Sequence, residues 1–189
     1  MGRTAQTLLL TGFEPFSKFR VNSSWEAIRD LDGEMMLGWR LAARRLPVSF
    51  RHAGPSLKRE LRRLNPGAVI SFGLAPERRI RLECLAVNID HDGRTVKNRP
   101  IDPRGPLAVE SRLPLEAMLR RLRRLELPAR PSFHAGTYLC NHVFYLLPRD
   151  IPSGFIHLPP IGRGWTLARL RRAVREIVLA GIKNWRLVV

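Results

Sequence analysis

Short apolar segments that match buried strands alternate along this chain with longer segments of helical periodicity. Thr7–Thr11 and Ala68–Gly73 are compact apolar runs, and between them Leu57, Leu61 and Leu64 mark one face of a helix. Alternation of this kind places helices on both faces of a mostly parallel sheet. The pattern therefore predicts an α/β protein: a three-layer α/β/α sandwich with a central mixed, largely parallel sheet.

At 189 residues the chain is long enough to bury a substantial core, and we expect a single domain over 1–189. Further strands are expected at 40–48, 82–90 and 155–158, and further helices at 22–33, 114–125, 139–147 and 167–178. We also expect a surface loop at 91–107 and a last strand or interface segment at 185–189.

The formal net charge is +17, and only four of the 33 basic residues are lysines. Such a surplus can bind nucleic acid. However, the arginines lie mainly on helical segments, and no zinc-finger spacing or aromatic RNA-binding pattern accompanies them. Solvated helix faces are the favoured interpretation, and nucleic acid is not an expected partner.

No apolar run is long enough to cross a bilayer, and the first one is too short for a signal peptide. We therefore expect a cytoplasmic protein with no membrane partner. The two cysteines, Cys84 and Cys140, have no metal-site spacing, so a structural zinc site is not expected.

Cys140 follows a turn of small residues and precedes an apolar helical run, which puts its sulfur at a helix N-terminus. There the helix dipole and unpaired N–H groups favour thiolate over thiol. His157 lies in an apolar strand segment just before Pro159. Each alone is more often a packing residue, but together they predict a thiol nucleophile with its base.

A histidine base needs an orienting group on its second ring nitrogen. Glu83 is a candidate because it interrupts an apolar segment, where an unpaired carboxylate is costly to bury. An outward-facing strand position explains Glu83 equally well. The three positions fit a Cys/His/Glu triad, but their spacing leaves open whether they converge.

Phe13 and Phe16 follow the first strand in a turn that contains Gly12 and Pro15. Loops at strand ends bind ligands in α/β proteins, so the two rings can wall a small apolar pocket. A hydrophobic lid over the core is an equally good interpretation.

Several segments carry a more specific likeness, in this order: TGFEPF at 11–16 with NSSWEA at 22–27, ECLAVN at 83–88, LPLEAM at 113–118, AGTYLCNHVFY at 135–145 and GFIHLP at 154–159. Together they resemble the pyroglutamyl peptidase I (pyrrolidone-carboxylate peptidase) family. The likeness covers nearly the whole chain, and the segment around Cys140 is the most specific part.

The resemblance implies a cysteine exopeptidase that removes 5-oxoproline from the N-terminus of peptides. It implies a triad of Glu83, Cys140 and His157, with Arg94 near the reacting carbonyl. It also implies an α/β/α sandwich and a homo-oligomer, with a tetramer as the family's frequent assembly. No metal or organic cofactor is implied.

A pyroglutamyl group has no free amine, so its site must accept a neutral lactam ring, which suits an apolar pocket with a few backbone hydrogen bonds. We expect Phe13, Phe16, Tyr138 and Leu139 to enclose the ring, and backbone groups near Leu74 to bind the lactam.

The chain also departs from the family pattern. Ser17 and Lys18 replace small glycines, Leu74 replaces a frequent glutamine, the segment between Cys140 and His157 is shorter, and matching Arg94 requires a one-residue insertion. Two alternatives therefore stay open: a basic binding protein on the same scaffold with lost or altered amidase activity, and a thiol hydrolase with a different acyl pocket.

Overall fold

The computed structural model describes residues 5–17, 19–91, 98–162 and 164–185. Its main feature is a seven-stranded sheet in the order β2-β3-β1-β4-β9-β5-β8. The strands are β1 (Gln6–Phe13), β2 (Met35–Met36), β3 (Trp39–Leu46), β4 (Ala68–Leu74), β5 (Ile80–Glu83), β8 (Ala129–Ser132) and β9 (Ser153–Leu158). Neighbours from β3 to β9 are parallel, as are β5 and β8, whereas β2–β3 and β9–β5 are antiparallel.

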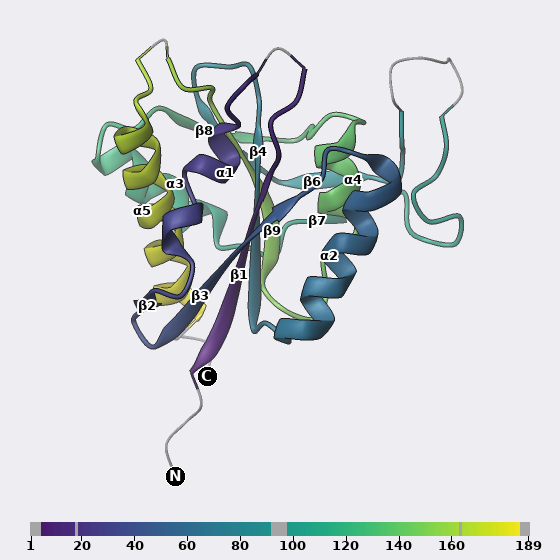
Figure 1. Ribbon diagram of the computed structural model, residues 1–189, viewed down its shortest axis with the longest axis horizontal. Helices are drawn as coiled ribbons and strands as arrows, with labels where there is room; N and C mark the ends of the chain where they lie inside the picture. Colours follow the sequence, from purple (N-terminus) through teal and green to yellow (C-terminus); the bar gives the residue numbers. More distant parts are fainter. Residues whose placement is uncertain (1–4, 18, 92–97, 163, 186–189) are drawn as a thin grey trace.

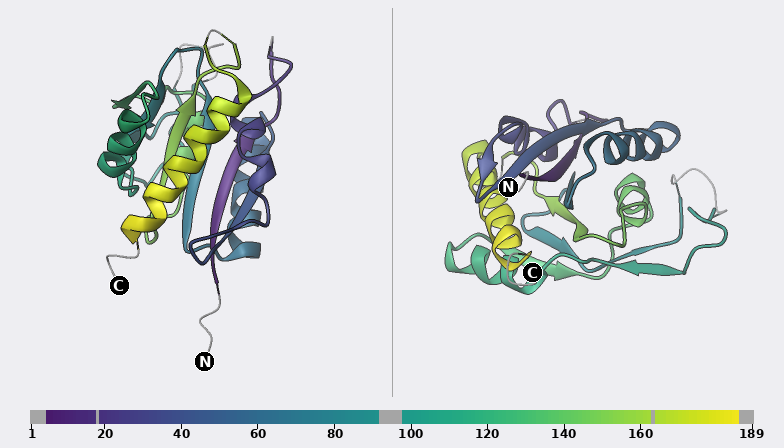
Figure 2. Two further views of the ribbon diagram at one scale, coloured as in Figure 1. Left: turned by 90° about the vertical axis from the view of Figure 1, so that its left-hand side faces the viewer. Right: turned by 90° about the horizontal axis from the view of Figure 1, so that it is seen from below.

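Helices cover both faces of this sheet (Figures 1 and 2). On one face lie α1 (Ser23–Glu26), α3 (Leu115–Arg124) and α5 (Leu167–Trp185); on the other lie α2 (Phe50–Leu64) and α4 (Leu139–Tyr145). A separate two-stranded sheet joins β6 (Leu85–Val87) to β7 (Ala108–Glu110). The predicted three-layer sandwich with a mixed, largely parallel sheet is confirmed.

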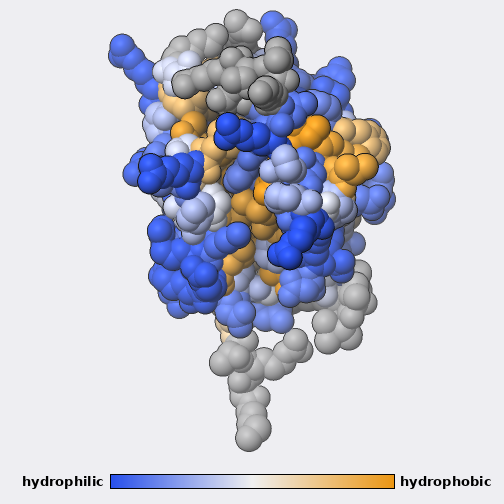
Figure 3. All heavy atoms as spheres, turned by 90° about the vertical axis from the view of Figure 1, so that its right-hand side faces the viewer, coloured by the Kyte–Doolittle hydropathy of each residue, from blue (hydrophilic) through white to orange (hydrophobic). Residues whose placement is uncertain are grey.

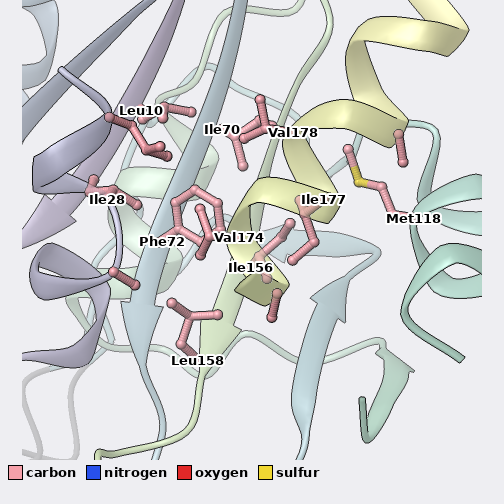
Figure 4. Packing of buried hydrophobic residues seen from close by; sticks show 14 of the residues in the cluster. Leu10, Ile28, Ile70, Phe72, Met118, Ile156, Leu158, Val174, Ile177 and Val178 are labelled. Carbon is pink, nitrogen blue, oxygen red and sulfur yellow. The ribbon is translucent and has the colours of Figure 1, made fainter. Parts of the chain in front are cut away.

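The core consists of two apolar layers because the strands present apolar side chains to both faces. On β1, Leu8 and Leu10 belong to the layer beneath α1, α3 and α5, whereas Leu9 belongs to the layer beneath α2 and α4. In the first layer, Val174 and Ile177 of α5 pack over the sheet (Figure 4). Burial on both faces explains the uninterrupted apolar runs of the parallel strands.

The strand expected at 82–90 is wrong in its extent. β5 stops at Glu83, where the N–H of Cys84 donates to the carbonyl of Ser132 at 2.7 Å. The chain then leaves the main sheet, and β6 pairs with β7 instead. A change of partner sheet within one apolar segment leaves no mark on local periodicity.

Other expected bounds also need correction. The helix expected at 22–33 ends at Glu26 and is followed by a 3₁₀ turn at Arg29–Leu31. The last helix extends to Trp185, so that residue begins no strand, and 186–189 lie outside the described residues. β7 and β8 were not expected; β8 contains Pro131, which is tolerated because β8 is an edge strand.

The side that carries α2 and α4 is mostly hydrophilic, with apolar atoms in small groups between polar side chains (Figure 3). Within the part of the chain that the structure describes, no helix combines the length and apolar character that a bilayer crossing needs.

Candidate active site

The candidate residues lie at one edge of the sheet. β1, β4 and β9 all end at the same edge because they are parallel, and the N-terminus of α4 lies there too (Figure 1). This edge, outside the carboxyl ends of the strands, is where open α/β sheets bind ligands.

His157 and Glu83 meet through the antiparallel pairing of β9 with β5. His157 lies opposite Arg81 in the register, so Glu83, two residues further along β5, is its diagonal neighbour on the same face. Nδ1–H of His157 donates to Oε1 of Glu83 at 2.7 Å. Both side chains are buried, at 5% and 0% exposure, so the contact is shielded from water.

Cys140 is the second residue of α4, and its sulfur lies close enough to the His157 imidazole for its charge to raise the pKa of that ring. Gly73 makes room for the sulfur, because a Cβ at that position would lie 2.9 Å from Sγ and 2.8 Å from the Phe155 ring. The structure thus brings Cys140, His157 and Glu83 together from α4, β9 and β5.

The electrostatics of this cluster favour a charged imidazole. Burial by itself would lower the pKa of His157, but the charge of Cys140, its hydrogen bond, and the Glu83 carboxylate together raise that pKa to about 9. An imidazolium with a sulfur on one side and a carboxylate on the other is the arrangement expected of an activated thiol.

Arg81 is a site residue that we did not predict. Its Nε donates to Oε1 of Glu83 at 2.8 Å, and its other nitrogens donate to Oε1 of Glu77 at 2.6 Å and to the carbonyl of His134 at 2.5 Å. Oε1 of Glu83 therefore accepts from both His157 and Arg81, whereas its buried Oε2 has no partner among the described residues. The sequence did contain a signal for Arg81: side chains alternate between the two faces of a strand, so Arg81 and Glu83, two residues apart, lie on the same face of β5.

A small cavity of about 60 Å³ opens beside the sulfur. All five predicted pocket residues line it together with Cys140: Phe13, Phe16, Leu74, Tyr138 and Leu139. Asn22 and Val48, which were not predicted, complete the wall. The lining is almost wholly apolar and suits a compact, uncharged group.

Asn141 and His142, next to Cys140 on α4, anchor the segment that follows β6. The buried Asn141 amide accepts from the N–H of Val87 at 2.9 Å and donates to the carbonyls of Val87 and Ile89 at 2.9 and 3.0 Å. Nδ1 of His142 lies 2.8 Å from an Asp90 carboxylate oxygen. Two polar side chains inside an apolar helix were the overlooked sequence signal.

The remaining predicted positions contribute less. Arg94 lies outside the described residues. Ser17, where the family pattern has glycine, adopts a φ of 52°, a left-handed conformation that glycine accepts more easily. Burial raises the pKa of the Cys84 thiol, so this second cysteine is held in its unreactive form. Among the described residues, no group of three or more His, Cys, Asp or Glu side chains is placed to hold a metal ion.

Comparison with known proteins gives a consistent result. A sequence model of the pyroglutamyl peptidase family matches residues 6–169. A pyrrolidone-carboxylate peptidase of Chromobacterium violaceum is 46% identical over 163 residues, covering 82% of this chain and 78% of that protein. The protein of that name from Pseudomonas fluorescens SBW25 is 40% identical over 189 residues, covering 93% and 88%.

Solved structures agree with the sequence relatives. Pyrrolidone carboxyl peptidase from Thermus thermophilus superimposes with a TM-score of 0.83 at 38% identity, covering 92% of this chain and 99% of that chain. The enzyme from Pyrococcus furiosus gives a TM-score of 0.89 at 30% identity, covering 95% and 99%. On sequence and on fold, this chain belongs to the pyroglutamyl peptidase family, a family of cysteine omega peptidases.

Proposed function

We propose that the protein hydrolyses the bond after an N-terminal pyroglutamyl residue of peptides, using Cys140, His157 and Glu83 as a catalytic triad. The observation that supports this most strongly is the position of the buried His157 imidazole, which donates to Glu83 at 2.7 Å and has its pKa raised by the neighbouring Cys140 sulfur. A nucleophile, its base and a group that orients the base are the diagnostic arrangement for covalent acyl transfer by a thiol.

In the proposed mechanism, His157 holds the proton of Cys140, and the thiolate attacks the pyroglutamyl carbonyl. Glu83 keeps the Nδ1–H of His157 in place and stabilises the imidazolium. His157 then protonates the leaving amine, and a thioester remains on Cys140. Water, activated by the same histidine, hydrolyses the thioester and releases pyroglutamate.

The tetrahedral intermediate needs donors for its oxyanion. The backbone N–H of Cys140, in the first turn of α4, is one candidate because such groups have no partner within the helix. Arg94 is proposed as a second donor on the basis of the family resemblance alone. Loss of one such donor typically lowers the rate by roughly 10²–10³-fold.

The apolar cavity beside Cys140 is proposed to hold the lactam ring. Phe13, Phe16, Tyr138 and Leu139 would enclose its methylene groups, and backbone groups near Leu74 would bind its N–H and carbonyl. The cavity, of about 60 Å³, is compact and lies directly beside Cys140. Its apolar wall also disfavours the ammonium group of an ordinary N-terminus, which is costly to bury.

From the sequence we also propose that residues 1–189 form one domain and that the protein is cytoplasmic. We further propose a homo-oligomer, for which the family resemblance favours a tetramer. A binding role on the same scaffold is the alternative, favoured by the net charge of +17 and by the departures from the family pattern at Leu74 and around Arg94. Nucleic-acid affinity falls steeply with salt, whereas hydrolysis of a neutral lactam substrate does not depend on released counterions.

The test is hydrolysis of a pyroglutamyl chromogenic amide, compared with prolyl and alanyl amides of the same leaving group, at low and high salt. We expect cleavage of the pyroglutamyl amide alone, and its loss in Cys140→Ser. Cleavage of the other amides at a similar rate would indicate a thiol hydrolase with a different acyl pocket. No cleavage by the native protein, or full activity in Cys140→Ser, would refute the proposal.

A further inference from the structure

A second, larger cavity of about 270 Å³ lies at the same edge of the sheet. Phe19, Pro160, Ile161 and Trp165 supply apolar surface to its wall, and Glu77 and Arg78 supply charge. None of the residues expected to bind the lactam ring takes part in this cavity, so it is distinct from the apolar one beside Cys140.

Two strand ends lead from the catalytic cluster to this second cavity. β4 passes Gly73, which lies against the sulfur, then Leu74 in the small cavity, and reaches Pro76 in the large one. β9 carries His157 and reaches Pro160 three residues later. Three extended residues span about 10 Å, which is also the length of two to three residues of a bound peptide.

The turn after β1 provides the third connection. Phe16 lines the small cavity and Phe19 lines the large one. The N–H of Phe19 donates to the carbonyl of Phe16 at 2.9 Å, and the two ring centroids are 5.5 Å apart. The two cavities are therefore neighbours, with Phe16 in the wall of one and Phe19 in the wall of the other.

A peptide substrate needs such a second space. The small cavity is filled by the ring, and His157, which must protonate the leaving amine, lies on the strand that runs on to the large cavity. The peptide beyond the scissile bond therefore leaves the sulfur on the His157 side. The large cavity is placed to receive the residues that follow the pyroglutamyl group.

The charge of this cavity is unbalanced in favour of anions. Both carboxylate oxygens of Glu77 are already paired, Oε1 with Arg81 at 2.6 Å and Oε2 with Arg130 at 3.0 Å. Burial would raise the pKa of Glu77, but these hydrogen bonds and charges keep it below its usual value, so its negative charge is present and already compensated. Arg78 has no carboxylate partner among the described residues.

The backbone of Arg78 is held in place by the side chain of Trp165. Nε1–H of the buried Trp165 donates to the carbonyl of Arg78 at 2.8 Å. Trp165 is itself fixed by reciprocal backbone hydrogen bonds with Gly162, at 2.8 and 3.0 Å. The backbone of Arg78 is thus fixed at the cavity wall, and its exposed side chain starts from that point.

We propose that this cavity is the binding site for the leaving peptide, and that Arg78 gives the enzyme a preference for a carboxylate just after the pyroglutamyl residue. The inference rests on the proposed function. The carboxylate can come from an Asp or Glu side chain or from the C-terminus of a pyroglutamyl dipeptide. Apolar contact with Pro160 and Ile161 adds affinity without selecting charge.

The test compares kcat/KM for pyroglutamyl-Asp-Ala-amide and pyroglutamyl-Lys-Ala-amide, measured by release of pyroglutamate. The native enzyme should favour the Asp peptide, and Arg78→Glu should change the ratio by about tenfold towards the Lys peptide. Arg79→Glu is the matched control, since this exposed neighbour carries the same charge but does not line the cavity. It should change the ratio by less than about twofold.

A second pair separates the two sources of the carboxylate: pyroglutamyl-Ala with a free and with an amidated C-terminus. If Arg78→Glu changes only the ratio between the Asp and Lys peptides, Arg78 binds the side-chain carboxylate. If it changes only the ratio between free and amidated pyroglutamyl-Ala, Arg78 binds the C-terminal carboxylate. Equal shifts in Arg78→Glu and Arg79→Glu would indicate only long-range attraction and would overturn the inference, as would no shift in either. Failure of the native enzyme to cleave any pyroglutamyl peptide would instead refute the proposed function.

Discussion

Nδ1 of His157 lies 2.7 Å from Oε1 of Glu83, although 74 residues separate the two in the sequence. The contact depends on an antiparallel pair, β9 with β5, inside an otherwise largely parallel sheet. That pairing puts a carboxylate beneath an imidazole whose other side faces the Cys140 sulfur. The change of strand direction between β9 and β5 is thus what assembles the cluster.

Glu83→Gln should lower kcat by roughly 10²–10⁴-fold and move the alkaline limit of activity to lower pH. The pKa of His157 is raised to about 9, so its cation and the associated ion pairs persist at neutral pH and are lost as the pH rises through that value. Removing the carboxylate removes one cause of the raised pKa. The pH profile of kcat/KM measures the shift, and an unmoved limb would mean that Glu83 does not act on His157.

Cys84→Ser should retain activity within about twofold, whereas Cys140→Ser should abolish it. Burial raises the pKa of the Cys84 thiol, so little of it is thiolate at neutral pH. Limited alkylation at pH 7 followed by peptide mapping should find the label on Cys140. Preferential labelling of Cys84, with activity lost in step, would contradict this assignment.

The layers of the fold were predictable because burial on both faces leaves a strong local signal. Leu8, Leu9 and Leu10 are all fully buried although they point alternately to opposite layers, so β1 appears as a plain apolar run. β8 left no such signal, because this edge strand carries exposed Arg130 and Pro131 and is defined only by its pairing with β5. Non-local pairing cannot be inferred from a local pattern.

In the candidate site, too, local features could be predicted from the sequence whereas non-local contacts could not. The residue types at Cys140 and His157 could be recognised from their surroundings, because a cysteine after a small-residue turn and a histidine in an apolar strand are unusual. Their meeting with Glu83 could not, since it depends on the register in which Arg81 lies opposite His157. Arg81 was not predicted because arginine is common in this chain, so its residue type gave no indication of a special role.

Phe16→Ala should raise KM for a pyroglutamyl amide by about tenfold and leave kcat nearly unchanged. Phe16 is half-buried and lines the small cavity, and the contact area of an aromatic ring is worth about 1.5–3 kcal/mol when it is fully covered. Phe133→Ala is a suitable control, because that ring is 70% exposed and lines neither cavity. A fall in kcat at constant KM would place Phe16 in the chemical step instead of in binding.

Arg81→Met should lower both kcat and stability, because it removes the arginine that shares Oε1 of Glu83 with His157. The methionine keeps the apolar stem but leaves Glu83 with His157 as its one partner. Breaking a buried charge-assisted contact costs about 2–4 kcal/mol, which is measurable as a fall in the free energy of unfolding. We expect kcat to fall by about tenfold as the carboxylate loses its fixed orientation.

Arg130→Met separates orientation of Glu83 from support of Glu77. Arg130 also binds Glu77, at 3.0 Å, but does not contact Glu83, and its side chain is 45% exposed. Its loss should therefore cost less than about 1 kcal/mol and leave kcat and its pH profile unchanged. If Arg130→Met reduced kcat as much as Arg81→Met, the effect would come through Glu77, and Arg81 would have no specific part in holding the triad carboxylate.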